Sequence, residues 1–218
     1  QALYLGTKIF PAPHWIICAY ADFFSYSWLK YTTAAPSNGN EFFAQLAFNP
    51  TRETSFYLRF FQEEKAQKLI LGTLKYNSEQ RINRLRFNFA HDLNELFSLK
   101  SRVELSFYSR QSSERGILIC QDLVYTPIEK PFSLNGRLAY FQTDGYNSRL
   151  YAYENDVLYA FSIPALYGNG IRAYFNFQQH LGDRFTFWLK LATTHQFAQG
   201  DGEQRVDSST KSELKIQL

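Results

Sequence analysis

The stretch KSRVELSFY, residues 100–108, decides the fold class of this chain. Arg102 and Glu104 occupy alternate positions in it, and apolar Val103 and Leu105 fall between and after them. Successive side chains of a β-strand point to opposite faces, so this spacing predicts a strand with one charged face and one apolar face.

The same alternation recurs along most of the chain. Two further examples are RLRFNF and FTFWLKL, at residues 84–89 and 185–191. Taken together, the alternating segments predict antiparallel strands that run down and up in turn. The expected strands are residues 2–10, 15–22, 41–48, 55–63, 82–90, 98–108, 116–125, 132–142, 171–178, 185–194 and 211–218.

The connections between these strands alternate in length, which indicates an outer-membrane β-barrel with short periplasmic turns and longer extracellular loops. A strand of about nine to eleven residues also matches a tilted crossing of the hydrocarbon layer. The expected turns are residues 10–14, 49–54, 91–97, 126–132 and 179–184, and the expected loops are 23–40, 64–80, 109–115 and 195–209.

We therefore predict an all-β, antiparallel up-and-down transmembrane β-barrel, with about 11–13 strands from this chain. A soluble barrel or sandwich is the main alternative, because alternation alone does not say which face points outward. That many strands would leave an interior too wide for these side chains to fill, which favours the membrane barrel. A β-propeller fits less well, since a blade places four short strands in a repeat of about forty residues and this chain places two long ones.

Composition agrees with this class. The 218 residues are 18% aromatic, carry a net charge of +3 and include no methionine. The mean hydropathy is −0.35, and no run approaches the roughly 18 apolar residues of a spanning helix. We expect residues 1–218 to be one outer-membrane barrel domain, the C-terminal part of a longer protein and a fragment of a larger barrel.

The segment 143–170 is harder to place. Both flanking strand ends are expected on the extracellular side, so the segment must cross the membrane either twice or not at all. Two short strands, 149–154 and 157–162, folded at Asn155 and Asp156 would meet this condition. A long loop that enters the lumen would meet it equally well.

The strand faces opposite the aliphatic ones are expected to line the lumen. This set holds more bases than acids, which would suit an anion-selective pore. Alternatively, the bases pair across strands with the acids and with a plug or loop, and thereby seal the lumen. The predicted lumen-facing residues are Arg59, Arg84, Arg86, Lys100, Arg102, Glu104, Arg137, Arg172 and Lys190, with Lys8, Lys215, Glu63 and Glu213 in the same set.

No motif predicts catalytic residues, a cofactor or a metal. Glu154, Asn155 and Asp156 have oxygen ligands that could hold a cation, but three consecutive polar residues more often make a turn. We accordingly expect a barrel that is not an enzyme. Its expected partners are outer-membrane lipid and other outer-membrane or periplasmic proteins, with no nucleic acid contacted by this segment.

Three segments resemble the C-terminal barrel of a Bacteroidota outer-membrane family described as helix-hairpin-helix domain-containing proteins. They are residues 100–109, GILICQDLVYTP at 116–127, and RLAYFQTDGYNSRLYAYENDVLYAFSIPALYGNGIRAYF at 137–175. Cys120 departs from the aromatic-rich form of that strand. The resemblance implies an outer-membrane location and a barrel. Because the sequence shows no catalytic or permeant site, we expect a structural or interaction subunit or anchor in an envelope assembly; a solute channel with a basic, anion-favouring lumen is the alternative.

Overall fold

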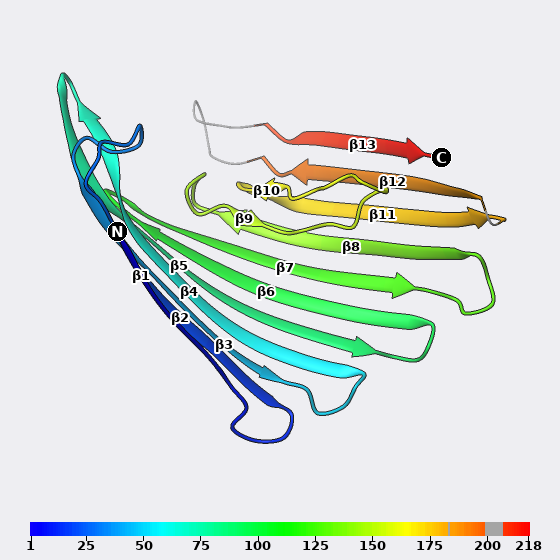
Figure 1. The fold of residues 1–218 in the computed structure, drawn as a ribbon. Helices are drawn as coiled ribbons and strands as arrows, with labels where there is room; N and C mark the ends of the chain where they lie inside the picture. The colour runs from blue at the N-terminus through cyan, green and yellow to red at the C-terminus, as the bar shows by residue number, and fades with distance from the viewer. Residues whose placement is uncertain (183, 199–206) are drawn as a thin grey trace.

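The alternating segments form one large antiparallel sheet in the computed structural model, which describes residues 1–182, 184–198 and 207–218. Eleven strands lie in the order β1-β2-β3-β4-β5-β6-β7-β8-β11-β12-β13, so consecutive strands are neighbours, except where β8 pairs directly with β11 (Figure 1). Their bounds are β1 Ala2–Ile9, β2 Trp15–Tyr26, β3 Ser37–Phe48, β4 Thr54–Leu71, β5 Leu74–Asp92, β6 Phe97–Ser109, β7 Ser113–Tyr125, β8 Phe132–Thr143, β11 Asn169–Leu181, β12 Phe185–Gln196 and β13 Ser209–Gln217. The all-β, up-and-down antiparallel prediction is confirmed.

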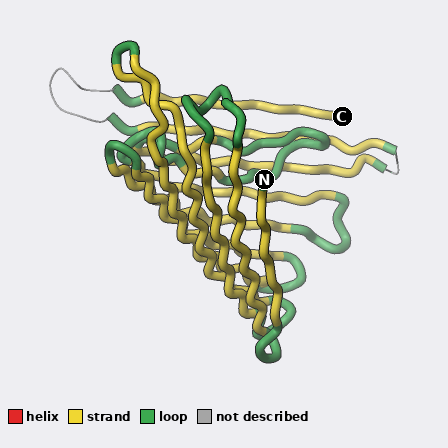
Figure 2. Tube along the Cα trace, turned by 60° about the vertical axis from the view of Figure 1, so that its left-hand side comes forward, coloured by secondary structure: helices red, strands yellow, loops and turns green. Residues whose placement is uncertain are grey.

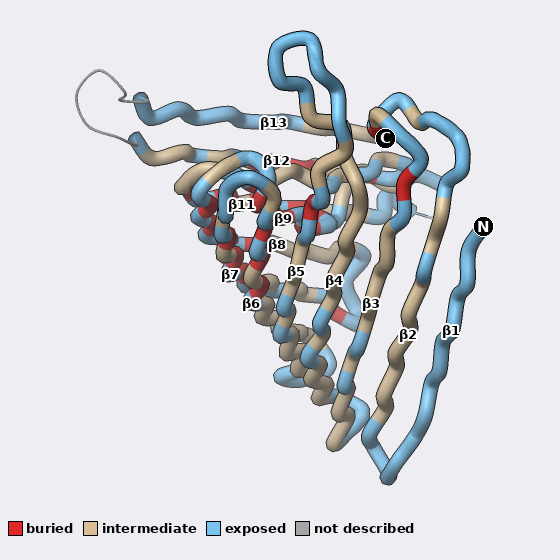
Figure 3. Tube along the Cα trace, turned by 90° about the vertical axis from the view of Figure 1, so that its left-hand side faces the viewer, coloured by how far each residue is buried: buried red, intermediate tan, exposed pale blue. Residues whose placement is uncertain are grey.

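The sheet is strongly curved but open. Among the described residues, strand β1 pairs only with β2 and β13 only with β12, so the sheet keeps two edges. Figures 2 and 3 show a trough with these two strands along its rims. Within the described residues the strands do not close into a barrel. None of the described residues forms a helix that is long and apolar enough to cross a membrane.

Several segments that the sequence predicts as loops form part of strands in the structure. Strands β4 and β5 continue through the expected loop 64–80 and pair as far as Leu71 and Leu74. The turn between them contains Gly72 at φ 60°, a conformation that suits a two-residue hairpin turn. Near this tip Ile70, Leu71 and Leu74 are all exposed, so neither face is buried and hydrophobic alternation gives no strand signal. Loops 23–40 and 109–115 likewise shorten, whereas turn 179–184 and loop 195–209 lie partly outside the described residues.

The segment between β8 and β11 does not join the sheet. It contains two short strands, β9 (Leu150–Tyr151) and β10 (Ala165–Leu166), which pair with each other. An isolated bridge joins Glu154 to Ser162, and Ala160 N–H donates to the Val157 carbonyl at the bend. The prediction of two strands folded at Asn155 and Asp156 is therefore wrong, because the chain turns later and its polar residues bind the sheet. The segment instead corresponds to the alternative of a long loop, since it adds no strand to the large sheet.

Candidate functional site

The convex face of the sheet presents an apolar row across its middle. Leu58, Phe87, Val103, Ile119 and Tyr140 lie directly opposite one another on successive strands from β4 to β8. Each is between 37% and 46% exposed, although large apolar side chains of soluble domains are usually covered. A contiguous apolar face of this size indicates contact with another apolar phase or partner.

Aromatic rings form a ladder along the same face, near the short turns. Trp15 stacks on Phe48 with ring centroids 4.5 Å apart, and Phe56 stacks on Phe89 at 4.9 Å. Phe89 is two positions from Phe87 on β5, so the ladder shares the convex face. Aromatic belts of this kind occur where membrane proteins meet the lipid headgroups. The ladder continues through Phe97, Tyr125, Phe132, Phe177 and Phe187.

The opposite, concave face carries every residue predicted to line the lumen. Residues that lie directly opposite each other on paired strands share a face of the sheet. Arg59 lies opposite Arg86, and Arg86 lies opposite Glu104, so these three are on the same face. Lys100 and Arg137 both lie opposite Asp122 on β7. The remaining members share this face by strand alternation, and they are Arg84, Arg102, Arg172, Lys190, Lys8, Lys215, Glu63 and Glu213.

One cluster on the concave face joins β11, β12 and β13 to the β9–β10 segment. Glu154 of the segment accepts two hydrogen bonds from Arg172, at 2.6 and 2.8 Å, and lies 3.3 Å from Lys190 Nζ. Asp156 lies 3.2 Å from Lys190 Nζ and 2.6 Å from Lys215 Nζ. Two acids of an irregular segment thus neutralise three bases from three strands. We call these five residues the docking cluster.

Three members of the docking cluster are deeply buried, while Lys215 at its rim is partly exposed. Glu154 is 1% exposed, Lys190 0% and Arg172 4%. Buried charges are stable only when paired and hydrogen-bonded, and this cluster provides both. Burial raises the pKa of Asp156, but hydrogen bonds from Lys215, the Val157 amide and Lys190 lower it more, so the net pKa lies below the ordinary 3.8. Asp156 is therefore ionised at neutral pH.

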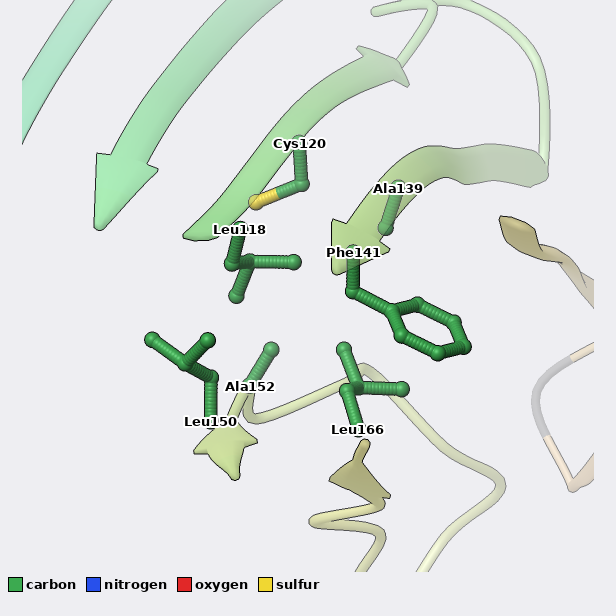
Figure 4. Close-up of a cluster of buried hydrophobic side chains, with 7 residues drawn as sticks. All are labelled: Leu118, Cys120, Ala139, Phe141, Leu150, Ala152 and Leu166. Carbon is green, nitrogen blue, oxygen red and sulfur yellow. The ribbon is translucent and has the colours of Figure 1, made fainter. Parts of the chain in front are cut away.

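Apolar contacts fix the same segment against β7 and β8. Figure 4 shows Leu150, Ala152 and Leu166 of the segment facing Leu118 and Phe141 of the sheet. Cys120 and Ala139 complete this fully buried cluster.

The backbone of the segment approaches the sheet closely at one glycine. A Cβ on Gly116 would lie 2.4 Å from the Ser148 carbonyl oxygen, so glycine is needed there. Glu114 accepts hydrogen bonds from the Asn147 and Ser148 amides, and Arg137 donates to the Tyr153 carbonyl at 2.7 Å. The segment is therefore docked along much of its length.

Several acids of this face were missed by sequence reasoning. Asp122 forms an ion pair with Arg137 and shares its face, and strand alternation within residues 116–125 would have placed it there. Glu154 and Asp156 had no such signal, because their segment has no regular period. The turn expected at these residues lies later in the chain, where the Ala160 amide donates to the Val157 carbonyl, and the two carboxylates bind basic side chains of the sheet. No cluster of three potential metal ligands occurs within residues 1–182, 184–198 and 207–218.

Comparison with known proteins adds no assignment. No protein-family model matches the chain, and a search of curated proteins finds no match.

Replacing Glu154 with Gln should release the segment. Arg172 and Lys190 would lose their shared carboxylate while remaining buried, at a cost of about 3–5 kcal/mol. Hydrogen exchange at Leu150 and Tyr151, which pair with β10, should accelerate strongly. The control is Glu64→Gln, which breaks the more exposed pair with Arg81 and should cost less than about 1 kcal/mol. Equal protection of the segment in the two variants would contradict this account.

Proposed function

We propose that this chain forms part of the wall of a bacterial outer-membrane β-barrel and serves as a structural or interaction subunit of an envelope assembly. One observation carries the proposal: the sheet has an apolar convex face bounded by an aromatic ladder and a charged concave face. On β6 the outward positions from Phe97 to Phe107 are Phe, Leu, Ser, Val, Leu and Phe. A face without charge over this length suits the hydrocarbon layer, where a basic residue costs about 2–4 kcal/mol at the midplane.

Closure of the sheet is part of the proposal, since lipid offers no hydrogen bonds to the free edges of β1 and β13. Eleven alternating strands make β1 and β13 run in the same direction. An antiparallel closure therefore needs an odd number of further strands, consistent with a fragment of a larger barrel. The likeness to the Bacteroidota barrel family stays a prediction that agrees with this arrangement.

The docked segment favours a structural role over an open pore. It places two carboxylates on the bases of β11–β13 and an apolar cluster on β7 and β8. On this half of the concave face the bases Arg172, Lys190 and Lys215 are paired with carboxylates of the segment. We propose that the segment stiffens and seals its side of the barrel, while outer-membrane lipid and other envelope proteins contact the outside and the rims.

Substitutions on β6 test the assignment of the two faces. Leu105→Arg should block membrane assembly, because it puts a charge on the lipid side at a cost of about 2–4 kcal/mol. Arg102→Leu on the concave face of the same strand should assemble far better. The measurement is the heat-modifiable, membrane-extracted fraction of each variant. Equal assembly of the two would count against the proposed facing.

A solute channel with an anion-favouring interior is the second candidate, favoured by bases on β4–β6 that have no carboxylate partner. Arg59 is bound by the Gln45 amide oxygen, and neither Arg84 nor Arg102 forms an ion pair within the described residues.

Planar-bilayer recordings on the purified protein separate the two candidates. The sealed structural barrel predicts no steady conductance in the wild type. A steady anion-selective current would overturn the structural proposal in favour of the channel. Glu154→Gln serves as the comparison, because release of the segment should raise the conductance.

A further inference from the structure

The β4–β5 hairpin projects beyond the rest of the sheet. Strand β3 pairs with β4 only as far as Lys65, and β6 pairs with β5 only from Arg81 onward. The two strands of the hairpin nevertheless continue to pair with each other up to Leu71 and Leu74 (Figures 1 and 3). Among the described residues, 66–80 therefore form a two-stranded arm with no strand of the sheet on either side.

Contacts at its base hold this arm in place. A two-stranded hairpin alone is only marginally stable in water, so such support is needed. The Lys68 amide donates to the Thr32 carbonyl at 2.7 Å, and the Asn77 side chain bonds to the backbone of residues 34–36. Arg110, directly after β6, donates to two backbone carbonyls of the arm at 3.0 Å. These contacts fix the direction of the arm, which lowers the entropic cost of binding a partner.

One face of the tip is apolar and exposed. Leu69 lies directly opposite Tyr76, and Leu71 directly opposite Leu74, so the four side chains form one continuous patch. Leu71 is 58% exposed, Leu74 72% and Tyr76 43%. We call these four residues the tip patch. Apolar side chains that are exposed together, and not singly, mark an interaction site.

Lipid does not cover the tip patch in the proposed barrel. On β4 the outward apolar positions end at Phe60, and Gln62 and Glu64 follow on the same face. Leu71 lies eleven residues beyond Phe60, which is about 36 Å along a strand at roughly 3.3 Å per residue. A straight arm tilted by about 45° then places the tip about 25 Å above the hydrocarbon boundary. The patch therefore lies in water on the side of the longer loops, where a protein surface can cover it.

The arm also carries unpaired positive charge. Lys68 and Lys75 lie on the face opposite the tip patch, and neither forms an ion pair within the described residues. Residues 66–78 include no acid, and Glu79 at the base of the arm is the nearest one in the sequence. Tyr31, which is 93% exposed, adjoins this face, because its ring lies 5.0 Å from Lys68 Nζ and its carbonyl accepts a hydrogen bond from that atom at 3.0 Å. Apolar anchors bordered by lysines and without acids are complementary to an acidic surface.

We propose that the tip patch, with Lys68, Lys75 and Tyr31 at its border, docks an acidic protein partner of the envelope assembly outside the cell. The partner presents an apolar pocket for Leu71 and Leu74, ringed by carboxylates that meet the two lysines. Anchors at the centre and charges at the rim are the usual arrangement of a protein interface. The inference rests on the proposed function and deepens it, since it names where the interaction subunit binds and with what chemistry.

Site-specific photocrosslinking in intact cells that produce the full chain tests the site. Leu74→p-benzoylphenylalanine should form one discrete protein adduct on irradiation. Mass spectrometry should place the crosslink on a partner segment with more Asp and Glu than Lys and Arg. The control is Ile128→p-benzoylphenylalanine, because Ile128 is 70% exposed but lies in a short turn at the other end of the sheet. The control should not form this adduct.

Single substitutions on the arm test the chemistry of the contact. Lys75→Glu should lower the yield of the adduct at least threefold by charge repulsion, whereas Lys75→Arg should leave it unchanged. Leu71→Ser, which removes an apolar anchor, should lower the yield by a similar factor. The heat-modifiable membrane fraction of all three variants should equal that of the wild type, since the arm lies outside the sheet.

The outcomes separate the docking site from the barrel. An adduct with lipid or glycan, an adduct within this polypeptide or with a second copy of it, or a yield unchanged by Lys75→Glu would overturn the proposal. A protein that inserts in the outer membrane but gives no adduct would reject the docking site alone. Absence of the wild type from the outer-membrane fraction would reject the barrel itself, and the docking site with it.

Discussion

The structure depends on the strict alternation of side chains along paired strands. Once β5, β6 and β7 pair in register, Phe87, Val103 and Ile119 must share one face while Arg86 and Glu104 share the other. A shift of one residue would exchange the faces and bury apolar side chains among charges. The pairing of the eleven strands therefore gives the sheet one apolar surface and one charged surface.

Charged side chains cover the concave face of the sheet. The two halves of the trough differ in how these charges are paired. On β11–β13, the docked segment supplies Glu154 and Asp156, and the buried bases become part of a satisfied network. Among the concave-face arginines of β4–β6, Arg86 is paired with Glu104, and Arg59, Arg84 and Arg102 form no ion pair within the described residues. The two halves of the concave face therefore differ in how far their charges are paired within the described residues.

The sequence predicts much of the sheet and only part of the site. Strands with one apolar face, such as β6, are found because apolar and polar side chains alternate along them with a period of two. The tip of the β4–β5 hairpin is missed, since Ile70 and Leu74 are exposed there and no period is enforced.

At the site, alternation places Arg172 and Lys190 on the correct face. It does not identify their partners, because Glu154 reaches them from an irregular segment whose path depends on tertiary contacts. The alternation of side chains also cannot predict closure of the sheet, because it carries no information on whether the edges of β1 and β13 are paired.

The central claim is that the convex face meets lipid and the concave face does not, and the native tryptophans test it directly. Trp15 belongs to the convex aromatic ladder, whereas Trp188 shares the concave face with Lys190 on β12. In single-tryptophan variants reconstituted in lipids brominated near the headgroup end, fluorescence of Trp15 should be strongly quenched and that of Trp188 little affected. Equal quenching of both, or stronger quenching of Trp188, would contradict the account.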